Sequence, residues 1–257
     1  MEKIYELPLD GMPLQHDPAL SEFRAPDIIK HYRGKLKNAV PYRRIKLMLV
    51  GNGGRGKTSL LRQLANLKHP SHNTATVGIE LRDWEMKAPG KKVGKNATSL
   101  ILNTWDFAGQ EEFYSTHQYF LTSRALYLAV FNASNGRSEL DNLRTWLLNI
   151  QASAPGAMVV LVGTHTDKIP SATREEYLDD LFRYINKFVN EPGFPKIHSK
   201  YIVNCMKETP AMEKLRTDIY DIISHFRHEG QQIIQQFVPR AYVELCLLYT
   251  SPSPRDS

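Results

Sequence analysis

One stretch of the chain decides its fold: Ile45-Lys46-Leu47-Met48-Leu49-Val50-Gly51-Asn52-Gly53-Gly54-Arg55-Gly56-Lys57-Thr58. The first six residues form an apolar run that predicts a buried strand. The last eight fit the pattern G-x-x-x-x-G-K-S/T, in which glycines let consecutive backbone N–H groups turn inward around an anion. An amphipathic helix is predicted next, from the spacing of Leu60, Leu61, Leu64 and Leu67. A strand, a glycine-rich loop and a helix in this order predict a phosphate-binding P-loop.

The P-loop predicts a bound nucleoside triphosphate with Mg²⁺. Lys57 would neutralise the β- and γ-phosphates, and Thr58 would offer its hydroxyl to the metal ion. The loop opens into a helix N-terminus, which favours anions. The other residues expected to line the phosphates are Gly51, Asn52, Gly53, Gly54, Arg55, Gly56 and Ser59. The alternative is a glycine-rich turn that arose by chance and holds no ligand.

Strand and helix patterns alternate along the rest of the chain. Apolar runs with strand character lie at 45–50, 78–86, 99–105, 125–131, 158–163 and 201–203. The second and third runs are joined by a loop rich in Gly, Lys and Pro, so they predict a β-hairpin. Helical spacing recurs in three apolar sets: 140–150, 178–189 and 215–226. This alternation predicts an α/β fold with a mostly parallel six-stranded sheet, one antiparallel hairpin and helices on both faces.

Length and composition favour one domain of ordinary size with extensions at one or both ends. The chain has 257 residues, of which 42% are hydrophobic, enough to bury a full core. No apolar stretch approaches the roughly 20 residues of a membrane span, and the N-terminus lacks the pattern of a signal peptide. Cys205 and Cys246 provide neither a disulfide framework nor metal-ligand spacing, so a cytoplasmic location is expected.

The formal net charge of +6 is unevenly distributed. Basic residues cluster at 30–46 and again at 87–95. Nucleic acid or anionic lipid could bind such clusters, but the only Phe, Tyr or Trp residues among them are Tyr32 and Tyr42 in the first cluster, too few for a row of base-stacking platforms. We therefore expect solvated surfaces and no nucleic-acid partner, with membrane recruitment possible only through a full-length protein.

The last residues depart from the pattern of the rest of the chain. The segment 246–257 looks like read-through translation of a sequencing adapter, so it is excluded from the fold prediction. The alternative is a genuine disordered tail rich in Ser and Pro.

A second motif separates the classes of P-loop protein. Asp106-Phe107-Ala108-Gly109-Gln110-Glu111-Glu112 resembles the D-x-x-G-Q-E switch II motif of the Ras superfamily. This resemblance implies that Asp106 holds Mg²⁺ through a water, that the Gly109 N–H binds the γ-phosphate, and that Gln110 orients the attacking water. Thr76 stands where the switch I threonine reaches the metal, with Thr74 as the alternative.

The base-binding motif is also expected from the resemblance. Thr164-His165-Thr166-Asp167 follows a buried strand, at the place of the guanine-reading motif N-K-x-D. Asp167 can accept hydrogen bonds from guanine N1–H and N2–H₂, a pairing that adenine cannot offer. The alternative role for Asp167 is to cap the next helix. Asn204 and Cys205 are candidates for a second loop beside the base.

The substitutions and flanks resemble one branch of that superfamily, the Roc domain of Roco proteins and of the leucine-rich-repeat kinases in particular. T-H-x-D is the usual base motif of these domains. Stretches that carry the resemblance include 7–10, 27–30, 39–42, 105–109, 112–117, 124–130 and 162–165. The resemblance implies a Ras-like fold divided into a linker at 1–40 after leucine-rich repeats, a Roc domain at 41–230 and the start of a COR domain at 231–245. It also implies a homodimer and often a kinase domain in the full-length protein.

The expected function is a guanine-nucleotide switch that binds GTP and GDP with Mg²⁺ and slowly hydrolyses GTP. Lys57 would supply charge and Gln110 would place the water. One rival is an ATP-dependent nucleotide kinase, which would need an arginine-bearing lid. Another is a nucleotide-binding scaffold for dimer assembly that never turns over.

Overall fold

The computed structural model describes residues 39–68, 76, 78–88, 99–107, 118–228, 231–234 and 236–244. The chain divides into two compact units. One is Arg43–Ile234, and the other joins Met1–Tyr42 to Gln235–Ser257. Gly109, Gln110 and the tail 246–257 lie outside the described residues.

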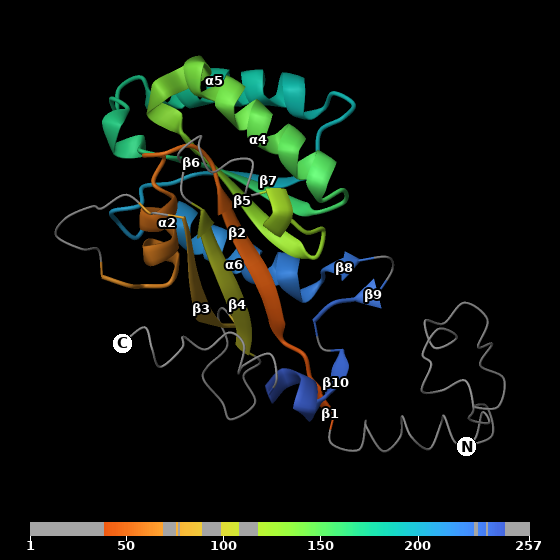
Figure 1. The fold of residues 1–257 in the computed structure, drawn as a ribbon. Coiled ribbons are helices and arrows are strands. Elements are labelled where there is room, and N and C mark those ends of the chain that lie inside the picture. The colour runs from red at the N-terminus through yellow and green to blue at the C-terminus, as the bar shows by residue number, and fades with distance from the viewer. Residues whose placement is uncertain are drawn as a thin grey trace, which may run out of the picture. The chain divides into compact units, whose positions relative to one another are not determined.

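A six-stranded sheet forms the centre of the unit Arg43–Ile234 (Figure 1). Its order is β3 (Ile79–Lys87), β4 (Ser99–Phe107), β2 (Arg44–Val50), β5 (Ala125–Asn132), β6 (Met158–Thr164) and β7 (Ile197–Ile202). All neighbours are parallel except β3 and β4, which pair antiparallel. The predicted fold class, with one antiparallel hairpin on a mostly parallel sheet, is confirmed.

Helices cover both faces of the sheet (Figure 1). They are α2 (Lys57–Leu64) and α6 (Pro210–Ser224) on one face, and α4 (Leu140–Ser153) and α5 (Arg174–Val189) on the other. Successive strand residues point to opposite faces, so Leu47 packs into the core under α2 while Met48 packs into the core under α4. Both faces of the central strands are therefore buried, which explains their continuous apolar sequence.

In the described part of the chain, 3₁₀ helices lie in three connections: η3 (Gln118–Phe120), η4 (Ala133–Glu139) and η5 (Thr166–Lys168). The connections η4 and η5 directly follow β5 and β6. Both strands are parallel to β2, so the residues after all three strands meet at one edge of the sheet.

Among the element boundaries that differ from the predicted ones, two have a clear physical reason. The helix after the P-loop ends at Leu64, and Leu67 lies outside it with a largely exposed side chain, because the chain turns at Asn66 through a positive φ of 54°. The last strand runs over Ile197–Ile202, where the prediction was 201–203. This strand is at the edge of the sheet, so its residues need not all be apolar.

The second unit contains a two-stranded antiparallel pair, β1 (Ala39–Pro41) with β10 (Phe237–Pro239). The backbone N–H of Tyr42 extends this pairing by donating to the Gln236 carbonyl over 2.7 Å. In the first unit, β8 (Arg227–His228) and β9 (Gln231–Gln232) form a short hairpin.

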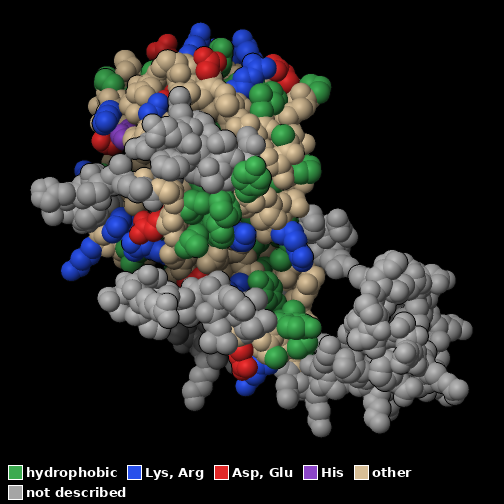
Figure 2. Space-filling model, in the orientation of Figure 1, with side chains coloured by type: hydrophobic (Ala, Val, Ile, Leu, Met, Phe, Trp, Pro, Cys, Tyr) green, Lys and Arg blue, Asp and Glu red, His purple; other side chains and the backbone are tan. Residues whose placement is uncertain are grey.

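The surface carries charges of both signs. On the face drawn in Figure 2, Lys and Arg side chains lie among Asp and Glu side chains around the described part of the chain. Within the same described residues, no helix combines the length and the apolarity that crossing a membrane requires.

Candidate functional site

The P-loop connects the central strand β2 to α2 and is closely packed at both ends. A Cβ on Gly51 would lie 2.2 Å from the carbonyl oxygen of Val130 on β5, and its φ is 139°. Gly56 forms the N-cap of α2 with a left-handed φ of 81°. A side chain would clash at the first position and strain the backbone at both, so glycine is required for geometric reasons.

Lys57 lies beneath the loop and is only 6% exposed. Its Nζ donates to the carbonyl oxygens of Gly51 at 2.7 Å and Asn52 at 3.0 Å. Burial lowers the pKa of Lys57 from 10.5 to about 8, the charge of Asp106 opposes this shift, and Arg55 lowers the pKa further. The ammonium is thus held at the loop by neutral carbonyls and has no ion pair among the described residues, which leaves its charge available to an anion.

Three residues from different segments meet beside the first turn of α2. The Thr58 hydroxyl donates to Oδ2 of Asp106, at the end of β4, and its Oγ1 lies 3.0 Å from Oγ1 of Thr76. Asp106 is 1% exposed, and its Oδ1 is buried without a hydrogen-bond partner among the described residues. Burial raises the pKa of the Asp106 carboxyl, while the Thr58 hydrogen bond and the charge of Lys57 lower it.

These oxygens fit a hard cation. Mg²⁺ takes oxygen ligands and keeps several of its waters, so two hydroxyls and one carboxylate with an unused oxygen are enough protein ligands. Elsewhere in the described residues there is no group of three His, Cys, Asp or Glu side chains that could hold a metal ion.

The loop after β6 packs directly against the P-loop. Thr164, 1% exposed, donates its hydroxyl proton to the Arg55 carbonyl at 2.7 Å. The same oxygen lies 2.8 Å from Nδ1 of His165. Because a hydroxyl has only one proton, His165 is the donor in that second contact. Burial lowers the pKa of His165, and the charge of Lys168 lowers it further.

Asp167 stands in η5 with an exposed side chain. It is the N-cap neither of η5, where His165 occupies that position, nor of α5, where Thr173 does. The capping alternative is therefore not observed. Asp167 lies near the loop that follows β7. Burial is the main cause that raises the pKa of the Cys205 thiol in that loop to about 12, and the negative charge of Asp167 is the second.

The loop after β7 also has an internal hydrogen bond. Oδ1 of Asn204 accepts from the backbone N–H of Met206 at 2.8 Å, and Cys205 is 7% exposed. Ser59 lies in the first turn of α2, partly exposed. The structure thus brings the P-loop, Thr76, Asp106 and the loops after β6 and β7 to one edge of the sheet, while Gly109 and Gln110 lie outside the described residues.

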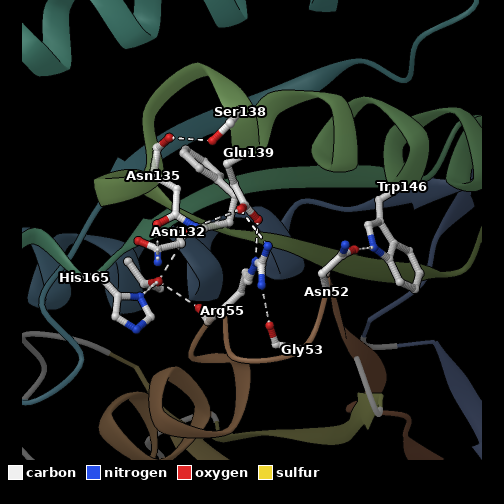
Figure 3. Close-up of polar contacts among 12 residues, drawn as sticks. Asn52, Gly53, Arg55, Asn132, Asn135, Ser138, Glu139, Trp146 and His165 are labelled. Carbon is white, nitrogen blue, oxygen red and sulfur yellow. Dashed lines mark hydrogen bonds and ion pairs between the residues drawn. The ribbon is translucent and has the colours of Figure 1, made fainter. Parts of the chain in front are cut away.

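Further polar residues at this site had no sequence signal (Figure 3). Trp146, on α4, donates from Nε1 to Oδ1 of Asn52 at 2.9 Å. Glu139, at the end of η4, accepts two hydrogen bonds from the Arg55 guanidinium. Both partners lie more than 80 residues from the P-loop in sequence, and a single sequence read for local patterns does not report such contacts.

A family model described as "Ras of Complex, Roc, domain of DAPkinase" matches residues 46–167. The chain is 31% identical over 258 residues to leucine-rich repeat serine/threonine-protein kinase 1 of Mus musculus. The alignment covers 94% of this chain and 13% of that protein. It is 28% identical to the Caenorhabditis elegans protein of the same name, covering 95% of this chain and 11% of that protein. The chain therefore spans about an eighth or less of these relatives.

Two further matches are to a Ras-related protein and to a solved structure. Ras-related protein Rab-27B of Bos taurus is 33% identical over 129 residues, which is 48% of this chain and 58% of that protein. The solved structure of Methanosarcina barkeri Roco2 RocCORdC bound to GDP matches with a TM-score of 0.59 and 24% identity. The match covers 84% of this chain and 58% of the solved chain, and at this identity it supports the fold alone.

Proposed function

Because this chain carries a Roc domain, the Ras-like domain of Roco proteins, we propose that it binds GTP and GDP with Mg²⁺ and hydrolyses GTP as a molecular switch. The observation that supports this most is the meeting of Thr58, Thr76 and Asp106 beside the buried Lys57. A carboxylate oxygen buried without a partner is costly unless something binds it, and a metal-bound water would be such a partner.

The proposed roles follow from the chemistry of each side chain. The Thr58 and Thr76 hydroxyl oxygens would hold Mg²⁺ directly, and Asp106 would hold it through a water. When bound, Mg²⁺ would neutralise part of the charge on the β- and γ-phosphates. Lys57 would exchange its two carbonyl contacts for phosphate oxygens, which are stronger partners for an ammonium.

Turnover would use water as the nucleophile, without a covalent intermediate. Gln110 would orient that water and the Gly109 N–H would bind the γ-phosphate, as in the motif they match. Without a partner protein the rate would be on the order of 10⁻⁴ s⁻¹, as for unassisted Ras-like domains. Loss of the γ-phosphate would release this segment and Thr76 together, which is the switch.

Guanine would be read by the loop after β6. The Asp167 carboxylate would accept from guanine N1–H and N2–H₂, with Asn204 and Cys205 on the neighbouring loop. Thr164 and His165 would hold this loop against the P-loop through the hydrogen bonds already made there.

Competition binding tests the proposal. A fluorescent GDP analogue should be displaced by GTP and GDP and far less by ATP, and Asp167→Asn should exchange guanine for xanthine preference by more than about tenfold. Asp141→Asn, an exposed carboxylate in the first turn of α4, is the matched control and should change nothing. Equal affinity of the wild type for ATP and GTP would refute the guanine assignment.

The second candidate is a scaffold that binds the nucleotide without turnover. Single-turnover phosphate release separates the two, because a scaffold would release no phosphate above the rate in the absence of protein.

The proposal also includes the domain organisation of the chain and of the full-length protein. We propose a linker at 1–40, a Roc domain at 41–230, the start of a COR domain at 231–245 and an adapter-derived segment at 246–257. The full-length protein would be a cytoplasmic homodimer, with a COR domain and a kinase beyond this chain.

A further inference from the structure

We infer that Arg55 and Glu139 form a brace that positions the P-loop for the nucleotide and slows nucleotide release. Arg55 occupies a variable position of the P-loop pattern and Glu139 precedes α4, 84 residues later. The inference rests on the proposed function, since it concerns the same site. It assigns a positioning role to the side chains of two residues, one within the P-loop and one outside it.

The contact has the geometry of a strong ion pair. Arg55 Nε donates to Oε1 of Glu139 at 2.6 Å and Nη2 donates to Oε2 at 2.8 Å, so both carboxylate oxygens are engaged in parallel. Such bidentate pairs are stronger and more directional than single contacts. The Glu139 side chain is 3% exposed and that of Arg55 is 24% exposed, so the pair is largely shielded from solvent.

The third arm of the guanidinium reaches the P-loop itself. Nη1 of Arg55 donates to the carbonyl oxygen of Gly53 at 2.6 Å, which is drawn in Figure 3. This contact fixes the orientation of the peptide between Gly53 and Gly54. In a P-loop the amide N–H groups must point at the phosphates, and turning a carbonyl outward turns the following N–H inward. Arg55 therefore favours the phosphate-ready conformation of the loop before any ligand is bound.

Glu139 is itself held in place from several sides. Asn135 donates from Nδ2 to its Oε2 at 3.3 Å, and Oδ1 of Asn135 accepts from Asn132 at 3.2 Å. Asn132 in turn accepts from the backbone N–H of Ser134 at 3.0 Å. Tyr177 on α5 ties the same segment down by donating to the Ala133 carbonyl at 2.9 Å. The carboxylate thus projects from a rigid segment, and Arg55 is oriented by it.

The test compares nucleotide release with P-loop order. Release of a fluorescent GDP analogue, chased by excess GDP, should be about tenfold faster or more in Arg55→Gln and in Glu139→Gln. In Glu139→Gln, the single-turnover rate at which bound GTP is hydrolysed should stay within about twofold, because Glu139 lies outside the P-loop. Arg137→Gln and Asp180→Asn remove an exposed ion pair between η4 and α5 and should leave both rates unchanged.

Two further variants make the result decisive. The double variant Arg55→Gln/Glu139→Gln should release nucleotide about as fast as either single variant. The increases in release rate should not multiply, because the second substitution removes the partner of an ion pair that is already lost. Arg55→Lys keeps the positive charge but cannot make the bidentate contact with Glu139, so it should release nucleotide faster than the wild type. This variant tests the inference even if Arg55→Gln does not fold. Multiplying effects, an unchanged release rate, or equal changes in the exposed-pair controls would each overturn the brace.

Hydrogen exchange of the nucleotide-free protein separates failure of the brace from failure of the proposed function. In Glu139→Gln, exchange should be faster for the amides of residues 53–56, with exchange in α5 unchanged. If the wild type binds no guanine nucleotide, the proposed function fails, and this exchange difference still decides whether the brace orders the loop. Equal exchange in the wild type and Glu139→Gln would overturn the inference.

Discussion

The Thr164 hydroxyl donates to the Arg55 carbonyl over 2.7 Å and thereby joins two loops that are 109 residues apart in sequence. One of these loops is proposed to read the base and the other to bind the phosphates. Because this contact is partly buried, we expect a change in one loop to alter the position of the other.

Thr164→Val should weaken this link. Valine has nearly the same shape, so the main loss is the hydroxyl's hydrogen bonding to the Arg55 and Phe131 carbonyls and to Nδ1 of His165, worth about 1–3 kcal/mol of unfolding free energy. Chemical denaturation measures the loss, and release of GDP should be faster in the same variant. Thr217→Val is the control, because that hydroxyl bonds only within its own helix α6 in an exposed position. Equal stability of Thr164→Val and wild type would contradict the prediction.

Thr58→Asn should remove the metal-binding hydroxyl. The affinity for GTP with Mg²⁺ should fall by about tenfold or more, while the affinity measured in excess EDTA should change little. Thr58→Ser retains a hydroxyl at the same position and should behave like the wild type. Equal losses with and without the metal ion would mean that Thr58 acts on the fold of the loop and not on Mg²⁺.

Gln110→Leu should slow hydrolysis without weakening binding. The leucine cannot orient a water, so the single-turnover rate should fall by about tenfold or more. Nucleotide affinity, measured in parallel, is the internal control. If the variant hydrolyses GTP as fast as the wild type, another residue places the water, and His117 is then the next to substitute.

Nucleotide binding near pH 8 should take up protons through Lys57. In the free chain burial holds the pKa of Lys57 at about 8, and phosphate oxygens beside the ammonium would raise it. The bound state then holds more protons than the free state, so affinity falls as the pH rises above 8. The expected uptake is roughly 0.5 proton per nucleotide at pH 8 and roughly 0.1 at pH 7.

Calorimetry in two buffers with different ionisation enthalpies measures this uptake directly. The heats of GDP binding should differ between the buffers at pH 8 and nearly agree at pH 7. Identical heats at pH 8 would show that Lys57 is already fully charged in the free protein.

The central strands and the P-loop could be predicted because their signals are local. A continuous apolar run such as 125–131 is readable wherever a strand is buried on both faces, and β5 is confirmed there. The edge strand β7 was placed too late because His198 and Lys200 interrupt its apolar pattern. At an edge, a strand is specified mainly by pairing with its neighbour, here β6, and that pairing is not written in local periodicity.

The candidate site divides in the same way. Lys57 and Thr58 were predicted from the P-loop pattern and Asp106 from the resemblance to switch II, and the structure brings Thr58 and Asp106 together beside Lys57. Glu139 and Trp146 were missed because nothing in their neighbourhood distinguishes them from other residues of an amphipathic helix start. Their roles arise only from long-range contacts with Arg55 and Asn52.

The pairing of β1 with β10 has a topological consequence. Since Tyr42 and Gln236 are joined by a backbone hydrogen bond, the polypeptide enters and leaves the unit Arg43–Ile234 through adjacent strands. Neighbouring strands are spaced about 5 Å apart, so the whole unit is an insertion that a hairpin loop of another protein could carry.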